Sequence, residues 1–233
     1  MISLGISTST ERGSVALVGD GRVLASEDWL HLEGHAERLF AALDRVFLEA
    51  RVSRGELGIV GCDIGPGSFT GVRVGVASAQ GIALGLGLRM VPVLSFEAMA
   101  QAARRIEQGG ARAFEAYVVA LDAKKDEAYL AELREGERVA ELLHLPRAEA
   151  AAWLEAARLR GLALVGAFAA ELGEGVLRSE RSDLPHAIAV AELALERAAR
   201  AVEVCEIAPE YVRAPDAKPQ SGGSPAASAQ SST

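Results

Sequence analysis

The sequence has few of the residues that build disulfide frameworks or metal sites. Its 233 residues include two cysteines, Cys62 and Cys205, and neither belongs to a CxxC pair or to a Cys/His cluster. A disulfide-stapled fold and a structural zinc site therefore find no support. Met1 leads directly into an apolar, strand-like stretch, without the charged segment and apolar core of a secretion signal. We therefore expect a reducing, cytoplasmic location.

The sequence also lacks an excess of basic charge. It has 24 Lys and Arg against 32 Asp and Glu, which gives a net charge of −8 and a pI near 5.2. Nonspecific affinity for nucleic acid comes mainly from clustered Lys and Arg. The composition argues against a chain that grips a phosphate backbone by itself, so any role with RNA would need a partner.

No long hydrophobic run is present either. The most apolar stretch, Val72–Gly87, covers about 16 residues and is interrupted by Arg73 and Gln80, whereas a membrane-spanning helix needs about 20. We therefore expect no membrane span. Half of the chain is nevertheless hydrophobic, which is enough for a substantial core in one large or two small domains.

Hydrophobic periodicity predicts two successive units with the same order of elements: three strands, a helix, a strand and a helix. Predicted strands are Ile2–Ser7, Gly13–Val18, Arg22–Leu30, Leu57–Ile64, Arg89–Leu94, Ala116–Leu121, Glu127–Arg134, Arg138–Leu143 and Leu162–Val165. Predicted helices are His35–Ala50, Val72–Gly87, Phe96–Gln108, Arg147–Arg158 and His186–Val204.

This order predicts an α/β fold of two lobes, each a mixed sheet flanked by helices with parallel crossovers. Gly109 and Gly110 separate the two units, so we expect an N-terminal lobe at 1–108 and a C-terminal lobe at 109–213. Residues 214–233 are rich in Pro, Ser, Ala, Gly and Gln, a composition typical of a disordered tail.

A glycine-rich segment, GPGSFTGVRVG at Gly65–Gly75, follows a predicted strand and opens into a predicted helix. That is the architecture of a phosphate cradle, and Ser68 or Thr70 is placed to cap the helix. The segment matches neither the dinucleotide fingerprint nor the P-loop, because Thr70 replaces the third glycine and Val72-Arg73 replaces the Lys-Ser/Thr pair. Two interpretations stay open: an anion-binding loop, or a tight connection between strand and helix.

Small residues recur at every fourth position of the helix behind this loop, at Gly71, Gly75, Ala79, Ala83 and Gly87. Glycine inside a helix costs roughly 1 kcal/mol relative to alanine, so the stripe needs a compensating close contact. The contact is either with the chain's own sheet or with a helix of another subunit. In the second case, replacing Gly75 or Ala79 by Leu would block assembly more than it unfolds the chain.

Other candidate motifs give weaker signals. His31 and His35 have the HxxxH spacing of a metal pair, but Gly34 at the predicted helix start places His31 outside the helix, so we expect no metal site. Ser68 is followed by Thr70 rather than a glycine two residues on, so the nucleophile elbow is missing. Asp122 ends a strand where Ala123-Lys124-Lys125 predicts a hairpin turn with solvated lysines.

Several motifs together resemble one protein family. They are Ile6–Thr10, Gly34-His35, Gly65–Gly75, the stretch LDAKKDEAY at Leu121–Tyr129, and Pro209–Arg213. The element order resembles the actin, Hsp70 and sugar-kinase superfamily, in which two halves clasp a nucleotide. Within it, residues 1 to about 215 resemble the TsaB (YeaZ) family of the bacterial machinery that makes threonylcarbamoyladenosine in tRNA.

The resemblance implies a non-catalytic scaffold subunit that pairs with the transferase subunit TsaD and recruits the ATPase TsaE. It implies no catalytic residue and no intrinsic cofactor, with ATP or ADP at the subunit junction of the complex, a homodimer when TsaD is absent, and tRNA contacted only through the complex. The partner interface expected from the first helix and the small-faced helix comprises His35, Leu39, Thr70, Arg73, Val74, Gly75, Ala79 and Ala83. A weaker set of anion or nucleotide contacts comprises Ser7, Thr8, Gly67 and Ser68.

Two positions depart from the family pattern. Ser7 stands where members usually carry the Asp that organises a nucleotide's metal ion in catalytic relatives, and Lys124 stands where they tend to carry Arg. Lys cannot reproduce a bidentate guanidinium contact. Two rival functions remain: an ATP-dependent phosphotransferase or ATPase of the same superfamily, and a metalloprotease with zinc or iron at His31 and His35.

Overall fold

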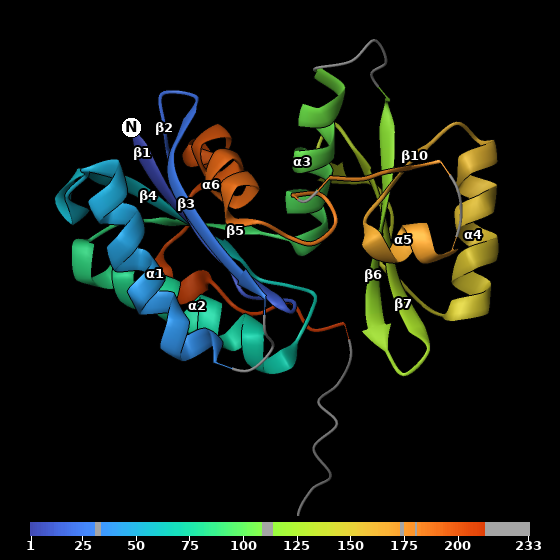
Figure 1. The fold of residues 1–233 in the computed structure, drawn as a ribbon, viewed down its shortest axis with the longest axis horizontal. Helices are drawn as coiled ribbons and strands as arrows, with labels where there is room; N and C mark the ends of the chain where they lie inside the picture. The colour runs from blue at the N-terminus through green and yellow to red at the C-terminus, as the bar shows by residue number, and fades with distance from the viewer. Residues whose placement is uncertain (31–33, 109–113, 173–174, 180, 213–233) are drawn as a thin grey trace, which may run out of the picture.

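The computed structural model describes residues 1–30, 34–108, 114–172, 175–179 and 181–212. These residues form two α/β lobes that lie side by side (Figure 1). Each lobe has one mixed sheet with helices on both faces. The predicted fold class is therefore confirmed.

The N-terminal lobe is built on a five-stranded sheet. Its strands are β1 (Ile2–Ser7), β2 (Arg12–Gly19), β3 (Arg22–Leu30), β4 (Leu57–Asp63) and β5 (Met90–Val93), in the order β3-β2-β1-β4-β5. The pairs β1–β2 and β2–β3 are antiparallel, whereas β1–β4 and β4–β5 are parallel. Helices α1 (His35–Ala50) and α2 (Phe69–Leu86) cover one face, and α6 (Ala187–Glu196) covers the other (Figure 1).

The C-terminal lobe repeats this plan. Its strands are β6 (Ala116–Lys124), β7 (Glu127–Arg134), β8 (Glu137–Arg138), β9 (Leu143–Pro146), β10 (Ala163–Val165) and β11 (Val176–Leu177). They run in the order β11-β10-β6-β7-β8, with β9 also paired to β7. Helix α3 (Ser95–Gln108) covers one face of this sheet, and α4 (Arg147–Leu159) and α5 (Ala167–Leu172) cover the other. Reading β6, β7, β9, β10 and β11 as β1 to β5 gives the same sheet order, so the predicted repeat of units is confirmed.

The two lobes exchange helices. The α3 residues Met99, Ala100 and Ala103 belong to the core of the C-terminal lobe. Helix α6, near the other end of the chain, packs on β1, β2 and β4 of the N-terminal lobe. The lobes are therefore not the contiguous segments 1–108 and 109–213 that the glycine pair predicted, because packing assigns α3 to the second lobe and α6 to the first.

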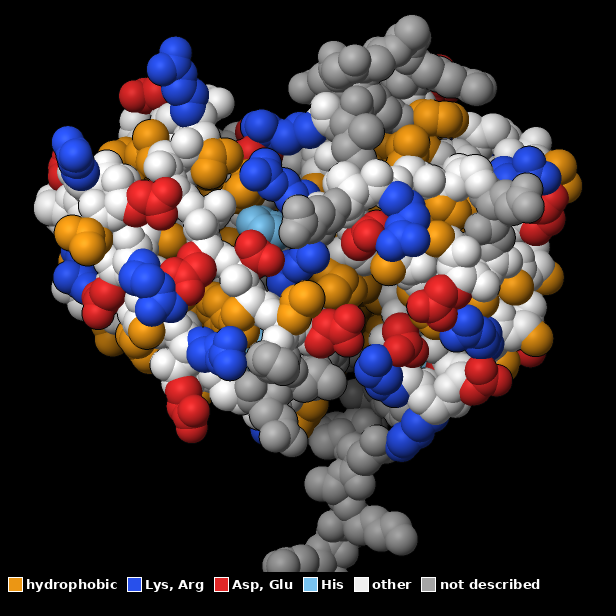
Figure 2. All heavy atoms as spheres, in the orientation of Figure 1, with side chains coloured by type: hydrophobic (Ala, Val, Ile, Leu, Met, Phe, Trp, Pro, Cys, Tyr) orange, Lys and Arg blue, Asp and Glu red, His pale blue; other side chains and the backbone are white. Residues whose placement is uncertain are grey.

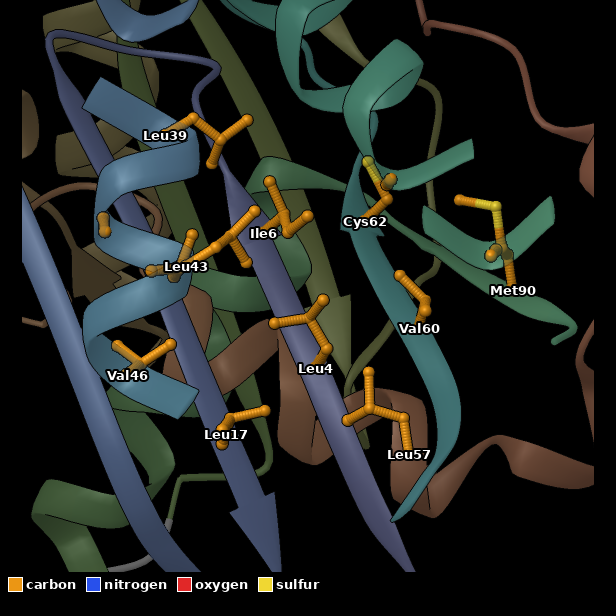
Figure 3. Close-up of a cluster of buried hydrophobic side chains, with 14 of the residues drawn as sticks. Leu4, Ile6, Leu17, Leu39, Leu43, Val46, Leu57, Val60, Cys62 and Met90 are labelled. Atoms are coloured by element: carbon orange, nitrogen blue, oxygen red, sulfur yellow. The ribbon is translucent and has the colours of Figure 1, made fainter. Parts of the chain in front are cut away.

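The core of the N-terminal lobe explains why α1 forms where predicted. Leu39, Leu43 and Val46 lie at helical spacing, and Figure 3 shows them pointing toward Leu4 and the neighbouring sheet. The helix begins after Gly34, at φ 89°, and ends at Arg51, at φ 54°. An apolar stripe bounded by two left-handed residues is a strong local signal, and the predicted bounds His35–Ala50 match the structure.

Other predicted bounds differ because tertiary pairing overrides local pattern. Helix α6 ends at Glu196 rather than at Val204, since Val202 is extended and bridges Met90 at the edge of the first sheet. Short 3₁₀ turns at Arg54–Glu56, Ala198–Arg200 and Val204–Glu206 complete the described elements. The predicted strand Arg138–Leu143 is replaced by β8 and β9, and α5 and β11 were not predicted. The tail at 214–233 lies outside the described residues.

Candidate functional site

A cleft of about 420 Å³ lies between the lobes. Its walls come from the loop after β1, the glycine-rich loop, the β6–β7 hairpin and the α5 region. Figure 2 shows acidic and basic side chains interspersed where the lobes meet. The lining residues are Ser9, Thr10, Glu11, Gly67, Ser68, Leu121, Asp122, Ala123, Lys124, Tyr129, Ala167, Phe168, Glu171, Asp183 and Leu184.

The glycine-rich loop packs tightly against the loop that follows β1. A Cβ atom on Gly67 would lie 2.0 Å from the Ser9 carbonyl oxygen, and the Ser68 amide donates to that same oxygen at 2.6 Å. A Cβ atom on Gly71 would lie 2.1 Å from the Thr8 carbonyl oxygen. Ser68 caps α2 by accepting from the Gly71 amide. Close backbone approach therefore accounts for these glycines, which favours the tight-connection interpretation.

The predicted anion contacts divide into two groups. Ser7 and Thr8 are fully buried, and the Thr8 hydroxyl donates to the Gly71 carbonyl oxygen at 2.8 Å. Their side chains face the interior of the lobe, so the prediction that they touch a bound anion is wrong. Gly67 and Ser68 do line the cleft.

A buried carboxylate stands behind the cleft, at the end of β4. Asp63 accepts hydrogen bonds from the hydroxyls of Ser7 (2.7 Å), Ser9 (2.5 Å) and Ser95 (2.7 Å), and from the Gly65 amide (2.9 Å). Burial raises the pKa of Asp63, and the four donors oppose that shift. The sequence pattern did not single out Asp63, although a carboxylate between a buried strand and a glycine-rich turn could have drawn attention to it.

On the opposite wall, Lys124 of the β6–β7 hairpin pairs with an acidic residue of the same hairpin. The Lys124 ammonium lies 2.7 Å from the Asp122 carboxylate, and its backbone amide donates to the same group at 2.8 Å. This pairing raises the pKa of Lys124. Lys124, Lys125 and Asp126 all have positive φ without being glycine, so the predicted turn is present in a tight left-handed form.

Two further acidic side chains of the cleft are also paired. Glu171 pairs with Arg147 at 2.8 Å, and Asp183 forms a bidentate pair with Arg178 at 2.7 and 2.9 Å. Each of these carboxylates is thus matched by a basic partner. Among the described residues that line the cleft, Lys124 is the one basic side chain against four carboxylates, so the cleft has no concentration of basic side chains that would attract a polyphosphate.

His35 is committed to contacts inside the N-terminal lobe. Its Nδ1 accepts from the Trp29 indole at 3.0 Å, and its Nε2 lies 2.9 Å from the Thr10 carbonyl oxygen, to which it donates. Both ring nitrogens are therefore occupied, so His35 is not placed to bind a metal. His31 lies outside the described residues. Within residues 1–30, 34–108, 114–172, 175–179 and 181–212, no group of three His, Cys, Asp or Glu residues could hold a metal ion.

The small stripe of α2 faces inward. Gly75, Ala79 and Ala83 are buried against the sheet, and a Cβ atom on Gly75 would lie 2.5 Å from the Thr8 hydroxyl. Leu39 and His35 of α1 are buried as well. The prediction that these five residues contact a partner is wrong, because their side chains fill the interior of their own lobe. Replacement of Gly75 by Leu would disrupt that lobe directly.

The other three predicted interface residues lie at the surface near the start of α2. Thr70 and Arg73 are exposed and Val74 is half-buried. The Arg73 guanidinium lies 3.6 Å from the centre of the Phe69 ring and donates to the Tyr211 hydroxyl at 2.8 Å. The contact brings the described part of the C-terminal motif, Pro209–Val212, onto α2 through Tyr211.

Several large apolar side chains are exposed on the outer face of α1 and α2, among charged ones. Phe40, Leu48 and Leu84 expose 56%, 80% and 74% of their surfaces. A groove of about 250 Å³ runs between the helices, and around Gly81 and Gly85 an added Cβ would meet no atom within 4 Å. By length and composition α2 could cross a membrane, but its inner face belongs to the core. Sequence reasoning left open whether the small stripe meets the chain's own sheet or another subunit, and the structure places the stripe on the sheet.

Comparison with known proteins places these features in a family. The family model described as TsaD, tRNA N6-adenosine threonylcarbamoyltransferase, matches residues 31–189. The tRNA threonylcarbamoyladenosine biosynthesis protein TsaB of Haemophilus influenzae is 35% identical over 130 residues, which cover 56% of this chain and 52% of that protein. The Escherichia coli protein of the same name is 38% identical over 134 residues, 58% of this chain and 55% of that protein. The chain thus spans about half the length of these curated relatives.

A solved structure matches over a greater length. It is that of an uncharacterised Pseudomonas aeruginosa protein with similarity to peptidase YEAZ, 30% identical to this chain with a TM-score of 0.73. The match covers 91% of this chain and 99% of that one. The similarity therefore extends to both lobes and their exchanged helices.

Proposed function

The chain belongs to the TsaB (YeaZ) group of the tRNA N6-adenosine threonylcarbamoyltransferase family, and from this membership we propose that it acts in tRNA threonylcarbamoyladenosine biosynthesis as a non-catalytic subunit. In this proposal its partner TsaD carries out the transfer. The chain holds TsaD in an active arrangement and recruits TsaE. ATP or ADP binds at the subunit junction rather than to this chain alone.

The state of Ser7 supports a non-catalytic role. In catalytic relatives of the superfamily a carboxylate at this position organises the nucleotide's metal ion, and here a hydroxyl is buried against Asp63. The opposite hairpin contributes Lys124, which is paired with Asp122. Three of the carboxylates that line the cleft, Asp122, Glu171 and Asp183, are already paired with basic side chains rather than open to an ATP-bound Mg²⁺.

The open face of α1 and α2 is the observation that carries the proposed partner contact. Phe40 lines the groove between the two helices, Leu48 and Leu84 are exposed on the same helices, and Gly81 and Gly85 let a second helix approach closely. Two glycines that make no close contact inside their own chain have a reason to be there if a partner packs on them. The same face would form the interface of a homodimer when TsaD is absent. With a net charge of −8, the chain would contact tRNA only through the complex.

The direct test is formation of threonylcarbamoyladenosine on tRNA, followed by mass spectrometry in a purified mixture of the pathway proteins with and without this chain. We expect formation to require the chain. Equal formation in its absence would refute the proposed role.

A matched pair of variants tests the partner face. Leu84 on α2 and Leu159 on α4 are exposed to 74% and 73%, so a charge at either position is tolerated by the fold. We expect Leu84→Glu to abolish co-purification with TsaD and threonylcarbamoyladenosine formation, and Leu159→Glu to preserve both. If both variants still assemble with TsaD, the partner binds another surface.

The cleft itself favours one alternative, an ATP-dependent phosphotransferase or ATPase. A volume of about 420 Å³ between two lobes is sufficient for a nucleotide, and Gly67 and Ser68 line it. A nucleotide-turnover assay on the isolated chain separates the two functions. Nucleotide turnover by the isolated chain that is lost when the cleft is blocked would favour the phosphotransferase or ATPase.

A further inference from the structure

A second pocket, of about 330 Å³, lies between α3, α6 and the turn at Ser179–Ser182, away from the interlobe cleft. Ala102 and Arg105 of α3 and Ile188, Ala189 and Glu192 of α6 line it, together with Ser179 and Arg181 from the turn. Figure 2 shows basic side chains gathered along the junction of α6 and α3. The pocket volume is in the range of small-molecule sites.

Glu192 is the unusual residue of this pocket. It is 4% exposed, and within the part of the chain that the structure describes its Oε1 has no hydrogen-bond partner. Arg105 forms an ion pair with it, with Nε 2.7 Å from Oε2. Buried carboxylates normally accept several hydrogen bonds, and each missing bond costs about 1–3 kcal/mol. A ligand that donates to Glu192 would remove this cost.

The two arginines supply the complementary charge. The side chain of Arg105 is 47% exposed and Arg181 is exposed, so both guanidinium groups have unused donors toward solvent. Ala102, Ile188 and Ala189 give the pocket an apolar wall. An acceptor at the bottom, donors at the mouth and an aliphatic side wall therefore surround one small volume.

We propose that this pocket binds a free α-amino acid with an aliphatic side chain. Its ammonium group donates to Glu192, its carboxylate pairs with Arg105 and Arg181, and its side chain packs on the apolar wall. A simple anion would place negative charge against the buried carboxylate, and a simple amine would leave the two guanidinium groups without a new partner. The zwitterion satisfies both ends. This inference goes beyond the proposed role in tRNA modification and does not depend on it.

The protonation of Glu192 provides an independent signature. Burial raises the pKa of Glu192 to about 7; Glu196 on the same helix adds to the shift, while Arg105 on α3 and Arg181 on the turn oppose it. An ammonium group beside the carboxylate favours its ionised form. Amino-acid binding should therefore release protons near pH 7, and affinity should rise as pH is raised through that value.

The test is isothermal titration calorimetry of the full chain with L-valine at pH 7, in two buffers of different ionisation enthalpy. We expect saturable binding with a buffer-dependent heat that reports proton release. N-acetyl-L-valine lacks the ammonium charge and L-valine methyl ester lacks the carboxylate, so both should bind at least about tenfold more weakly. Equal binding of either analogue would overturn the zwitterion assignment, and no binding of L-valine would overturn the site.

Variants locate the site. Glu192→Gln and Arg181→Gln should each weaken L-valine binding by about tenfold or more. Glu203→Gln is the control, because Glu203 is exposed, pairs with Arg89 and does not line the pocket. Unchanged binding in Glu192→Gln would overturn the assignment. Protection of α3 and α6 amides from hydrogen exchange by L-valine tests the location in the unaltered chain, and protection elsewhere would contradict it.

Discussion

Ser7 and Asp63 show how one buried carboxylate shapes its surroundings. Asp63 lies 2.7 Å from the Ser7 hydroxyl and also accepts from Ser9 and Ser95. An Asp at position 7 would bring a second carboxylate to within hydrogen-bond distance of the first, and like charges at that distance cannot both remain ionised. A hydroxyl instead donates to Asp63. The departure at Ser7 therefore fits this chain's own interior.

His186 leads to a prediction about acid stability. Its Nδ1 accepts from the Ile188 amide at the start of α6, and burial lowers its pKa from 6.5 to about 4. The unfolded chain takes up this proton near pH 6.5 and the folded chain only near pH 4. Stability is therefore lost as pH falls from about 6.5 to about 4, by about 3 kcal/mol at about 1.4 kcal/mol per pKa unit.

His186→Asn should remove this loss, because Asn caps a helix without titrating. The measurement is the free energy of unfolding from denaturant titrations at several pH values between 4 and 7. Glu192, whose raised pKa gives the opposite slope, is present in both proteins and cancels from the difference. If the variant loses as much stability in acid as the parent, His186 is not the acid-sensitive group.

Glu192 and Asp63 mark a limit of sequence reasoning. The motif at Gly65–Gly75 and the Asp122 turn were visible because they are local. Glu192 and Asp63 gain their properties from segments far away in the chain: α3 and the 179–182 turn for Glu192, β1 and the start of α3 for Asp63. No spacing within a single segment predicts that combination.

At the scale of the element, α2 has small residues on both faces. Gly75 and its neighbours in the stripe touch the sheet, whereas Gly81 and Gly85 are open to solvent. The sequence predicted that the small residues needed a close contact, and the inner face confirms this for the chain's own sheet. Periodicity could not decide which face was inward, because alanine and glycine occur on both.

The two faces give opposite predictions for one substitution. Gly81→Ala should stabilise the isolated chain by up to about 1 kcal/mol, since alanine favours the helix and the new methyl group meets nothing. Gly75→Ala should destabilise it by about 1–3 kcal/mol, because the methyl group would lie 2.5 Å from the Thr8 hydroxyl. Chemical denaturation of both variants provides the comparison. A neutral Gly75→Ala would contradict the close packing of α2 on β1.

Element boundaries followed the strength of local signals. Helix α1 was predicted to the residue because an apolar stripe coincides with left-handed residues at both ends. The end of α6 was predicted eight residues too late, at Val204 instead of Glu196, because a helix-favouring composition continues past it. Pairing of Val202 with Met90 decides that boundary, and this contact joins residues about half the chain apart.

At the scale of the molecule, Arg197 ties the lobes together. At the end of α6 it pairs with Glu97 of α3 at 2.9 Å and donates to the Gly136 carbonyl oxygen, in the turn between β7 and β8, at 3.0 Å. The side chains of Arg197 and Glu97 are 17% and 11% exposed. Arg200 pairs with Glu137 across the same junction, but these side chains are 73% and 59% exposed.

Arg197→Ala should cost about 2–3 kcal/mol of stability, because it removes the ion-pair partner of the largely buried Glu97 carboxylate, which keeps only the Leu94 amide, and the donor to the Gly136 carbonyl oxygen. Arg200→Ala, which removes an exposed pair, should cost less than about 1 kcal/mol. Amide hydrogen exchange in the β7–β8 turn should accelerate in the first variant only. Similar exchange in both variants would mean that the lobes are held together by apolar packing alone.

The repeat of units, the mixed sheet of each lobe and the two-lobed plan followed from the sequence because each unit carries its own hydrophobic periodicity. The assignment of helices to lobes did not follow from the sequence, because α3 and α6 have apolar residues that could pack on either sheet. Ala98 and Ala102 of α3 pack with Val190 and Leu193 of α6, so each helix also covers the other. Only the folded arrangement shows which sheet each helix completes.

The exchange of helices has a consequence for biosynthesis. A ribosome makes β1, β2 and β4 early, but the helix that covers their second face, Ala187–Glu196, is made after the whole second sheet. During translation the first sheet therefore keeps an apolar face uncovered while more than half of the chain is still to come. The nascent protein depends on a late segment to shield an early one, and this places its demand for chaperone protection in the long interval between them.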